Sequence, residues 1–235
     1  MDGIGFSTGS VAKSDVAGAL RLLWPHECGA VELSALRTHE LAPLVRAIPH
    51  LQLSQYEHVS VHAPSAFPAR EEAAIAAALL PLARRGWLVV LHPDTIHNPR
   101  VWAPFGSRLA IENMDRRKPV GRTVRELRPI FERLPQASFC LDVAHAWQCD
   151  GSLSEAANLL HEFGERLAEV HVSELDAQSR HVRLTPAGID AYQSLADLIP
   201  LHVPVIIEAP VQPHEIAAEL EASLVALGRL VTCAA

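Results

Sequence analysis

RLAIEN (108–113) and FCLDVAH (139–145) are short apolar runs that flank a helix-forming segment, residues 120–134. Each run has the length of one buried strand, and the segment between them has apolar residues at helical spacing. Near-continuous apolar strands that alternate with helices indicate a parallel sheet covered by helices. The stretch from 108 to 145 therefore predicts two parallel strands joined by a helix.

This unit repeats along the whole chain. Six further apolar runs have a similar length: GIGFS (3–7), AVELS (30–34), HVSVHAP (58–64), LVVLHP (88–93), EVHVSE (169–174) and VPVIIEAP (203–210). Helix-forming segments also lie at 14–24, 37–48, 70–85, 152–166, 186–199 and 212–228. Eight such strands predict an α/β fold, a closed (β/α)8 TIM barrel with its active site at the carboxyl ends of the strands.

Length and composition predict one domain over residues 1–235. The chain of 235 residues is close to the roughly 250 typical of such a barrel. Hydrophobic residues make up 49% of it, and no Pro/Gly/Ser-rich linker divides it. Residues 93–107 have the least regular pattern, and we expect them to form a loop over the barrel mouth.

From the second run onward, a residue that can bind a metal or transfer a proton stands near the end of each run. These residues are Glu32, His62, His92, Glu112, Asp142, His171 and Glu208. Side chains alternate between the two faces of a strand, so Val90 and His92 share one face, and Ala110 and Glu112 share another. The bulky apolar residues between them can face the helices. We therefore expect the polar ends to converge inside the barrel.

Charge, cysteine content and hydropathy narrow the class of protein. The net charge of −7 argues against a large nucleic-acid footprint. Cys28, Cys140, Cys149 and Cys233 show no paired spacing, and we predict free buried thiols. No signal peptide and no apolar run of membrane-spanning length stand out, so we expect a soluble, cytoplasmic protein.

Five of these segments carry a family resemblance. VVLHP, LAIEN, LDVAHAW, VHVSE and VIIEAP, in this order, resemble the xylose-isomerase-like TIM-barrel superfamily. This superfamily contains sugar isomerases and epimerases, inositol-catabolism enzymes and DNA-repair nucleases of the endonuclease IV type. The resemblance covers nearly the whole chain, and its most specific part is the pair IEN and LDVAH.

The resemblance implies a metal site held by Glu112, Asp142, His171 and Glu208. Such a mixed oxygen and nitrogen shell suits Mn²⁺, Mg²⁺, Co²⁺ or Zn²⁺. In an isomerase or epimerase the ion would stabilise an enediolate, with Glu112 and Glu208 as the catalytic pair that moves the proton. His145 follows Asp142 by three residues, and in the epimerases the matching histidine touches the substrate.

Three further histidines support an alternative. His62 and His92 lie where endonuclease IV-like proteins place additional zinc ligands, and His181 lies where those proteins have the histidine of an Asp-x-His pair. With His145, these residues would bind more than one zinc ion and activate water against a phosphodiester. However, Ser179 replaces the aspartate of that pair. We interpret the additional histidines as a histidine-rich metal pocket.

A larger set of residues is predicted to contact the substrate: His62, His92, His145, Glu32, Arg180, Arg183 and Trp102. A guanidinium can hold a phosphate or carboxylate with two hydrogen bonds, and an indole can pack against a sugar ring. Structural alternatives remain open for the last four. Glu32 can form an ion pair or cap a helix, the two arginines can face solvent, and Trp102 can pack in the core.

The leading hypothesis is a metal-dependent isomerase or epimerase of a small sugar, sugar phosphate or related hydroxy-ketone. An endonuclease IV-like zinc phosphoesterase is the alternative, and a barrel that binds a metal or ligand without turnover is a third hypothesis. The expected partner is a small carbohydrate, and neither nucleic acid nor a membrane is expected. Oligomeric state and metal identity do not follow from the sequence.

Overall fold

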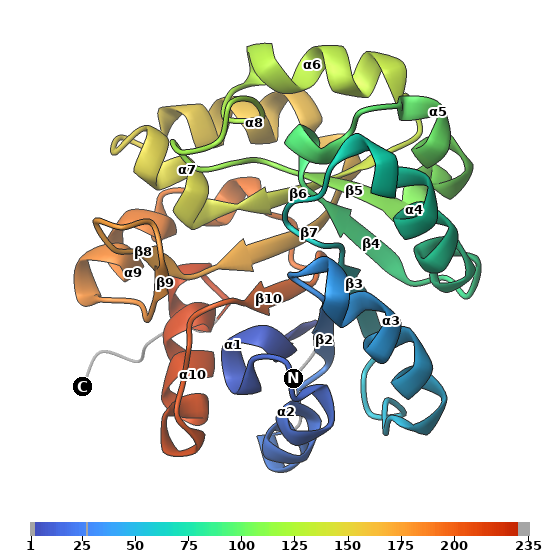
Figure 1. The fold of residues 1–235 in the computed structure, drawn as a ribbon. Helices are drawn as coiled ribbons and strands as arrows, with labels where there is room; N and C mark the ends of the chain where they lie inside the picture. Colours follow the sequence, from blue (N-terminus) through green and yellow to red (C-terminus); the bar gives the residue numbers. More distant parts are fainter. Residues whose placement is uncertain (1–2, 27, 230–235) are drawn as a thin grey trace.

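Eight parallel strands close into a ring in the computed structural model, which describes residues 3–26 and 28–229 (Figure 1). The strands are β1 (Ile4–Ser7), β2 (Ala30–Ser34), β3 (His58–His62), β4 (Leu88–Leu91), β5 (Leu109–Glu112), β6 (Ser138–Asp142), β7 (Leu167–Val172) and β10 (Val205–Ile207). Each pairs with the next, and β10 pairs with β1 to close the barrel. The predicted (β/α)8 barrel is confirmed.

The helices lie outside the ring, as the sequence predicts. Seven match the predicted segments: α2 (Val16–Leu23), α3 (Thr38–Ala47), α4 (Ala69–Arg84), α6 (Val124–Arg133), α8 (Ser154–Phe163), α9 (Pro186–Gln193) and α10 (Ile216–Ala226). The Asp15 carboxylate accepts a hydrogen bond from the Gly18 N–H at the start of α2 (2.8 Å), and Thr185 caps α9 in the same way. Local capping therefore sets where these helices begin.

Short elements that the sequence does not predict are inserted at the carboxyl ends of the strands. These are α1 (Thr8–Ala12) after β1, α7 (Val143–Cys149) after β6, and a hairpin of β8 (Glu174–Leu175) and β9 (His181–Val182) after β7. Because they follow the strands directly, they build the rim around the barrel mouth.

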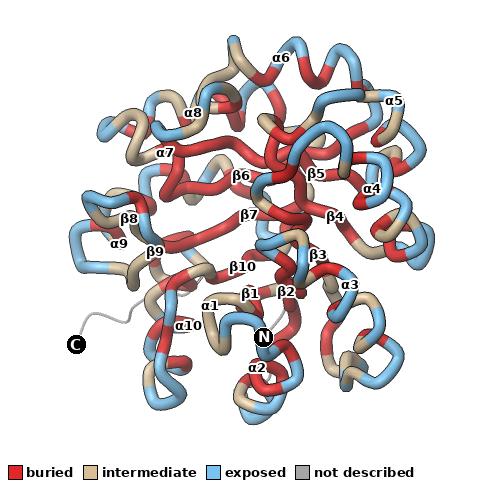
Figure 2. The backbone as a smooth tube through the Cα atoms, in the orientation of Figure 1, coloured by how far each residue is buried: buried red, intermediate tan, exposed pale blue. Residues whose placement is uncertain are grey.

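Alternation along the strands divides the buried residues into two groups. Val89 and Ile111 belong to the main core between the strands and the helices, whereas Val90, Ala110 and Cys140 form a small separate cluster inside the ring. Figure 2 shows the strands of the ring largely buried, with exposed residues on the surrounding helices. The predicted parity of the strands is confirmed, and the interior of the ring is left largely to polar side chains.

Residues 93–107 do not form the expected loop over the mouth. They fold into η3 (Pro93–Thr95) and α5 (Pro99–Trp102), followed by most of η4 (Ala103–Arg108), and they pack against α4. The buried Glu72 carboxylate on α4 accepts hydrogen bonds from the backbone N–H groups of His97 (2.9 Å) and Asn98 (3.0 Å). It also accepts one from the Trp102 indole (2.8 Å). Trp102 is therefore a core residue, and its prediction as a substrate contact is wrong.

Cys28 and Cys140 are buried free thiols, Cys149 is half-buried, and Cys233 lies outside the described residues. Within residues 3–26 and 28–229, no helix has both the length and the apolar character needed to cross a bilayer.

Glu72→Ala should destabilise the protein by about 2–4 kcal/mol, because it leaves buried N–H donors without an acceptor. Urea unfolding followed by circular dichroism measures the change. Glu71→Ala is the matched control, since its partly exposed side chain forms an ion pair with exposed Arg70 (3.5 Å), and we expect a change of no more than about 0.5 kcal/mol. Equal stability of the two variants would contradict this account of residues 93–107.

Candidate metal centre

The polar residues predicted to converge do so at the carboxyl end of the barrel. His62, Glu112, Asp142 and His171 lie at or near the ends of β3, β5, β6 and β7, while His92 and Glu208 directly follow β4 and β10. All are buried except Glu208, whose side chain is 11% exposed. The sequence therefore places this group correctly in space.

Hydrogen bonds to the backbone join the ends of β5 and β6 and hold the Asp142 carboxylate. The Asn113 side chain accepts from the Asp142 N–H and donates to the Asp142 carbonyl, both at 2.8 Å. The Asp142 carboxylate caps α7 by accepting from the His145 N–H (2.7 Å), and His145 Nδ1 lies 2.9 Å from the Asn113 carbonyl. These contacts give a physical reason for the IEN and LDVAH motifs, because they tie the end of β5 to the end of β6.

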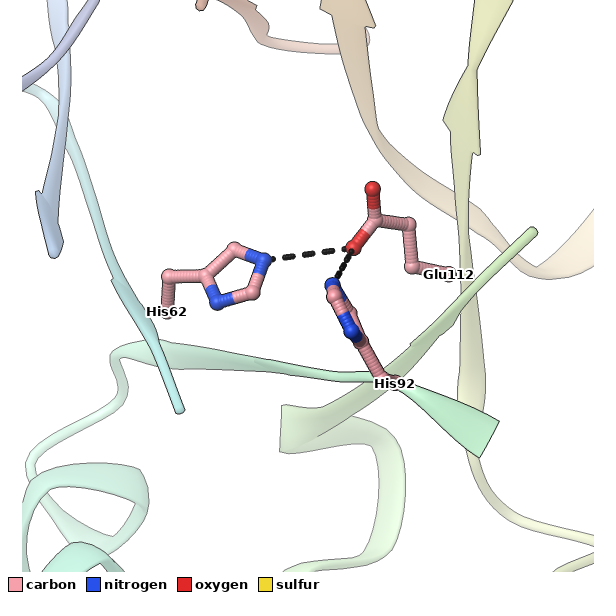
Figure 3. A group of neighbouring side chains, drawn as sticks. All are labelled: His62, His92 and Glu112. Atoms are coloured by element: carbon pink, nitrogen blue, oxygen red, sulfur yellow. Dashed lines mark hydrogen bonds and ion pairs between the residues drawn. The ribbon is translucent and has the colours of Figure 1, made fainter. Parts of the chain in front are cut away.

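A first donor group consists of His62, His92 and Glu112 (Figure 3). The Nε2 atoms of His62 and His92 lie 3.2 Å and 3.1 Å from the same oxygen, Oε2 of Glu112. His62 Nδ1 lies 2.7 Å from the Ala63 carbonyl, and a proton donated there leaves Nε2 to face the carboxylate. The two imidazole nitrogens and this carboxylate oxygen are therefore close enough together to bind one metal ion.

A second donor group consists of Glu112, Asp142, His171 and Glu208. One ligand atom from each lies within 4.8 Å of the others. His171 Nδ1 is 3.6 Å from both Glu112 Oε1 and Glu208 Oε2. This nitrogen is buried and has no hydrogen-bond partner in the described structure. Buried polar atoms usually have a partner, so a bound cation would account for this one.

A third donor group consists of Asp142, His145 and His181. His181 Nδ1 lies 2.8 Å from the Ser173 hydroxyl, while its Nε2 lies 3.7 Å from Glu208 Oε2. Ser179, in place of the aspartate discussed above, donates a hydrogen bond to the Gln148 side chain (2.9 Å). The third group therefore lacks a carboxylate from its own hairpin.

Burial and neighbouring charges shift the pKa values of residues in the three groups. Burial raises the pKa of Asp142 to about 8. Burial would lower the pKa of His145, but Asp142 and Glu112 outweigh it and raise that pKa to about 10. Burial also opposes ionisation of Glu112, yet His92 and the imidazoles around it hold its pKa well below the usual range. Carboxylates this close together require compensating positive charge, and the donor types fit divalent cations.

Comparison with known proteins agrees with this geometry. The family model described as xylose isomerase-like TIM barrel matches residues 99–224. The chain belongs to this family. No curated protein sequence matches the chain significantly.

Solved structures show the same fold as this xylose isomerase-like barrel. Endonuclease IV from Thermus thermophilus matches with a TM-score of 0.66 and 21% identity, over 97% of this chain and 100% of that one. SacUVDE has a TM-score of 0.52 and 17% identity, over 91% and 86%. An L-Ala-D/L-Glu epimerase has a TM-score of 0.52 and 16% identity, over 89% of this chain and 58% of the other. At these identities the likeness concerns the fold alone.

Three predicted substrate contacts have carboxylate or imidazole partners within this xylose isomerase-like barrel. Glu32 is fully buried inside the ring, with Oε2 3.5 Å from His171 Nε2. Arg180 pairs with Asp176 in its own hairpin (2.7 Å). Arg183 pairs with two carboxylates associated with α10, Glu215 at 2.6 Å and Glu219 at 2.8 Å. Each of these side chains thus has a partner within the protein, and their contact with a substrate stays a prediction.

Two acidic residues near the site were not predicted. Asp115 is buried in the segment after β5, pairs with Arg117 (2.5 Å) and lies 4.0 Å from His145 Nε2. Glu169 lies inside the ring, two residues before His171 on the same face of β7. The alternation rule could have identified Glu169, whereas no sequence signal places Asp115 beside a histidine 30 residues away.

The xylose isomerase-like barrel should bind more than one Zn²⁺ per chain, and the double variant His62→Ala/His92→Ala should bind about one ion fewer. The second group keeps all four of its donors in that variant, including Glu112, which it shares with the first group. Elemental analysis after Zn²⁺ loading and gel filtration gives the stoichiometry. The control is His39→Ala/His50→Ala, which removes two exposed histidines. Identical zinc content in all three proteins would rule out an ion at the first group.

Proposed function

We propose that this protein is a metal-dependent hydrolase of phosphate esters. The observation that carries the proposal is the sharing of carboxylates: Glu112 belongs to the first and second donor groups, and Asp142 to the second and third. Shared carboxylates place ions side by side, which is the arrangement of two-metal phosphoester hydrolysis. The likeness in fold to an endonuclease IV supports the same chemistry by analogy.

In such a site the buried and the partly exposed residues would have different roles. Divalent ions bound there would polarise a phosphoryl oxygen and lower the pKa of a water molecule. His62, His92 and Glu112 are buried and would keep bulk water from the inner side of the centre. His181 and Glu208 are the most accessible members, with side chains 30% and 11% exposed, so the substrate would approach from their side. His181 Nε2 is positioned to contact a substrate oxygen.

The substrate we propose is a small phosphorylated compound, such as a sugar phosphate, and not nucleic acid. The net charge is −7. Two arginines near the mouth also pair with carboxylates: Arg117 with Asp115, and Arg180 with Asp176. Binding of a long phosphate backbone depends on free basic side chains, and the ion pairs of Arg117 and Arg180 weaken such binding.

A sugar isomerase or epimerase is the second candidate. It is favoured by the second donor group, which is complete by itself, and by Ser179, which leaves the third group short of a carboxylate. In that reaction Glu112 and Glu208 would move the proton. Glu112 suits the role poorly, because it is buried and the surrounding imidazoles hold its pKa well below the usual range. Glu208, the more exposed of the two, is the better base.

A screen of phosphomonoesters and phosphodiesters with the Zn²⁺- and Mn²⁺-loaded protein tests the proposal by phosphate or alcohol release. Glu112→Gln should lower kcat roughly 100-fold or more, since it weakens two donor groups at once. Glu221→Gln, an exposed position on α10, is the matched control and should retain full activity.

Sugars and sugar phosphates incubated in D₂O provide the contrasting test. Deuterium incorporation at a carbon next to a carbonyl, without phosphate release, would replace the hydrolase by the isomerase. A loaded protein that catalyses neither reaction would favour a barrel that binds a metal or ligand without turnover.

A further inference from the structure

A buried carboxylate links the metal centre to the opposite end of the barrel. Glu169 is fully buried on β7, with its Oε1 3.1 Å from His171 Nε2. Its other oxygen, Oε2, lies 2.5 Å from His58 Nε2 at the start of β3. In the closed ring β3 and β7 are separated by three strands on either side, so this contact crosses the interior. The two imidazoles thus occupy the two oxygens of one carboxylate.

The two ring nitrogens of His171 face different surroundings. Nδ1 faces Glu112 and Glu208 in the second donor group and has no hydrogen-bond partner in the described part of the chain. Nε2 faces Glu169 Oε1 at 3.1 Å, with Glu32 Oε2 farther away at 3.5 Å. A neutral imidazole carries its proton on one nitrogen only, and the hydrogen bond made by that nitrogen decides which lone pair is free for a metal.

We propose that Glu169 is a positioning residue: it accepts the Nε2–H of His171 and so presents the Nδ1 lone pair to the metal ion. His58 holds Glu169 in place from the other side of the barrel. The proposal rests on the metal centre of the proposed function and is independent of the reaction catalysed there.

The contact with His58 explains how Glu169 can serve this purpose. A carboxylate removed from water and bonded through one oxygen only would be costly, and its second oxygen would be free to turn toward another donor. His58 satisfies that oxygen, and its side chain is 20% exposed, so it reaches the solvent side of the barrel floor. The orientation of a metal-binding histidine is thereby fixed by a residue on the far side of the ring.

A competing arrangement uses the same atoms differently. Cys140, Glu169 and His171 also offer ligand atoms within 4.8 Å of one another. An ion held there would bind His171 through Nε2 and would take a thiolate from Cys140. Each arrangement uses a different nitrogen of His171, and nitrogen NMR distinguishes the two.

The first experiment uses the wild-type protein, labelled with ¹⁵N-histidine and loaded with Zn²⁺. We expect His171, assigned by its loss in His171→Ala, to carry a slowly exchanging proton on Nε2 and to bind zinc through Nδ1. Zinc bound through Nε2 would overturn the proposal, as would a thiolate-to-metal charge-transfer band from Cys140 on loading with Co²⁺.

The second experiment measures Zn²⁺ affinity by competition with a chromophoric chelator. Glu169→Gln should weaken binding roughly 10- to 100-fold and make the Nε2 proton of His171 exchange faster. Glu165→Gln, an exposed position four residues earlier, is the matched control and should leave both unchanged. Unchanged affinity and proton exchange in a folded Glu169→Gln protein would refute the positioning role. Neither readout needs a substrate, so failure of the hydrolase proposal would leave this result interpretable.

Discussion

The carboxylate of Glu112 is the point on which the rest of the site depends. Imidazole nitrogens of four histidines lie 3.1–3.6 Å from its two oxygens: His62, His92, His145 and His171. They come from separate β/α units, so one buried charge orders side chains that are distant in sequence. Without these partners a carboxylate at this depth would be protonated or would force the surrounding strands apart. The barrel brings the strand ends together, and the Glu112 carboxylate orients the histidine side chains at those ends.

Much of this arrangement could be predicted because strand parity is a local property. The alternation of Val90 with Val89, or of Ala110 with Ile111, is visible in the sequence and places His92 and Glu112 on the inner face. The same rule applies one step further back on β7 and places Glu169 inside the ring. Glu169 stands at the beginning of its apolar run, whereas the residues predicted to converge stand at the ends. His58 likewise stands at the beginning of its run.

Other features depend on pairings that no local pattern reveals. Trp102 lies in the core because its indole meets the Glu72 carboxylate, 30 residues earlier on α4. Arg183 is held at α10 because its guanidinium donates a hydrogen bond to the Glu219 carboxylate. In each case the sequence shows a residue type suited to ligand binding, and only the fold shows that an internal partner already occupies it.

The reciprocal hydrogen bonds between Asn113 and the backbone of Asp142 have a consequence for how the centre would be filled. They set the spacing of two strand ends through the main chain, without help from a bound ion. The loss of conformational entropy needed to bring these ligands together therefore occurs on folding. Binding of an ion then requires little further ordering of the chain. Ions of similar size can then replace one another without local unfolding, and the metal present in a given cell would reflect supply as much as selection.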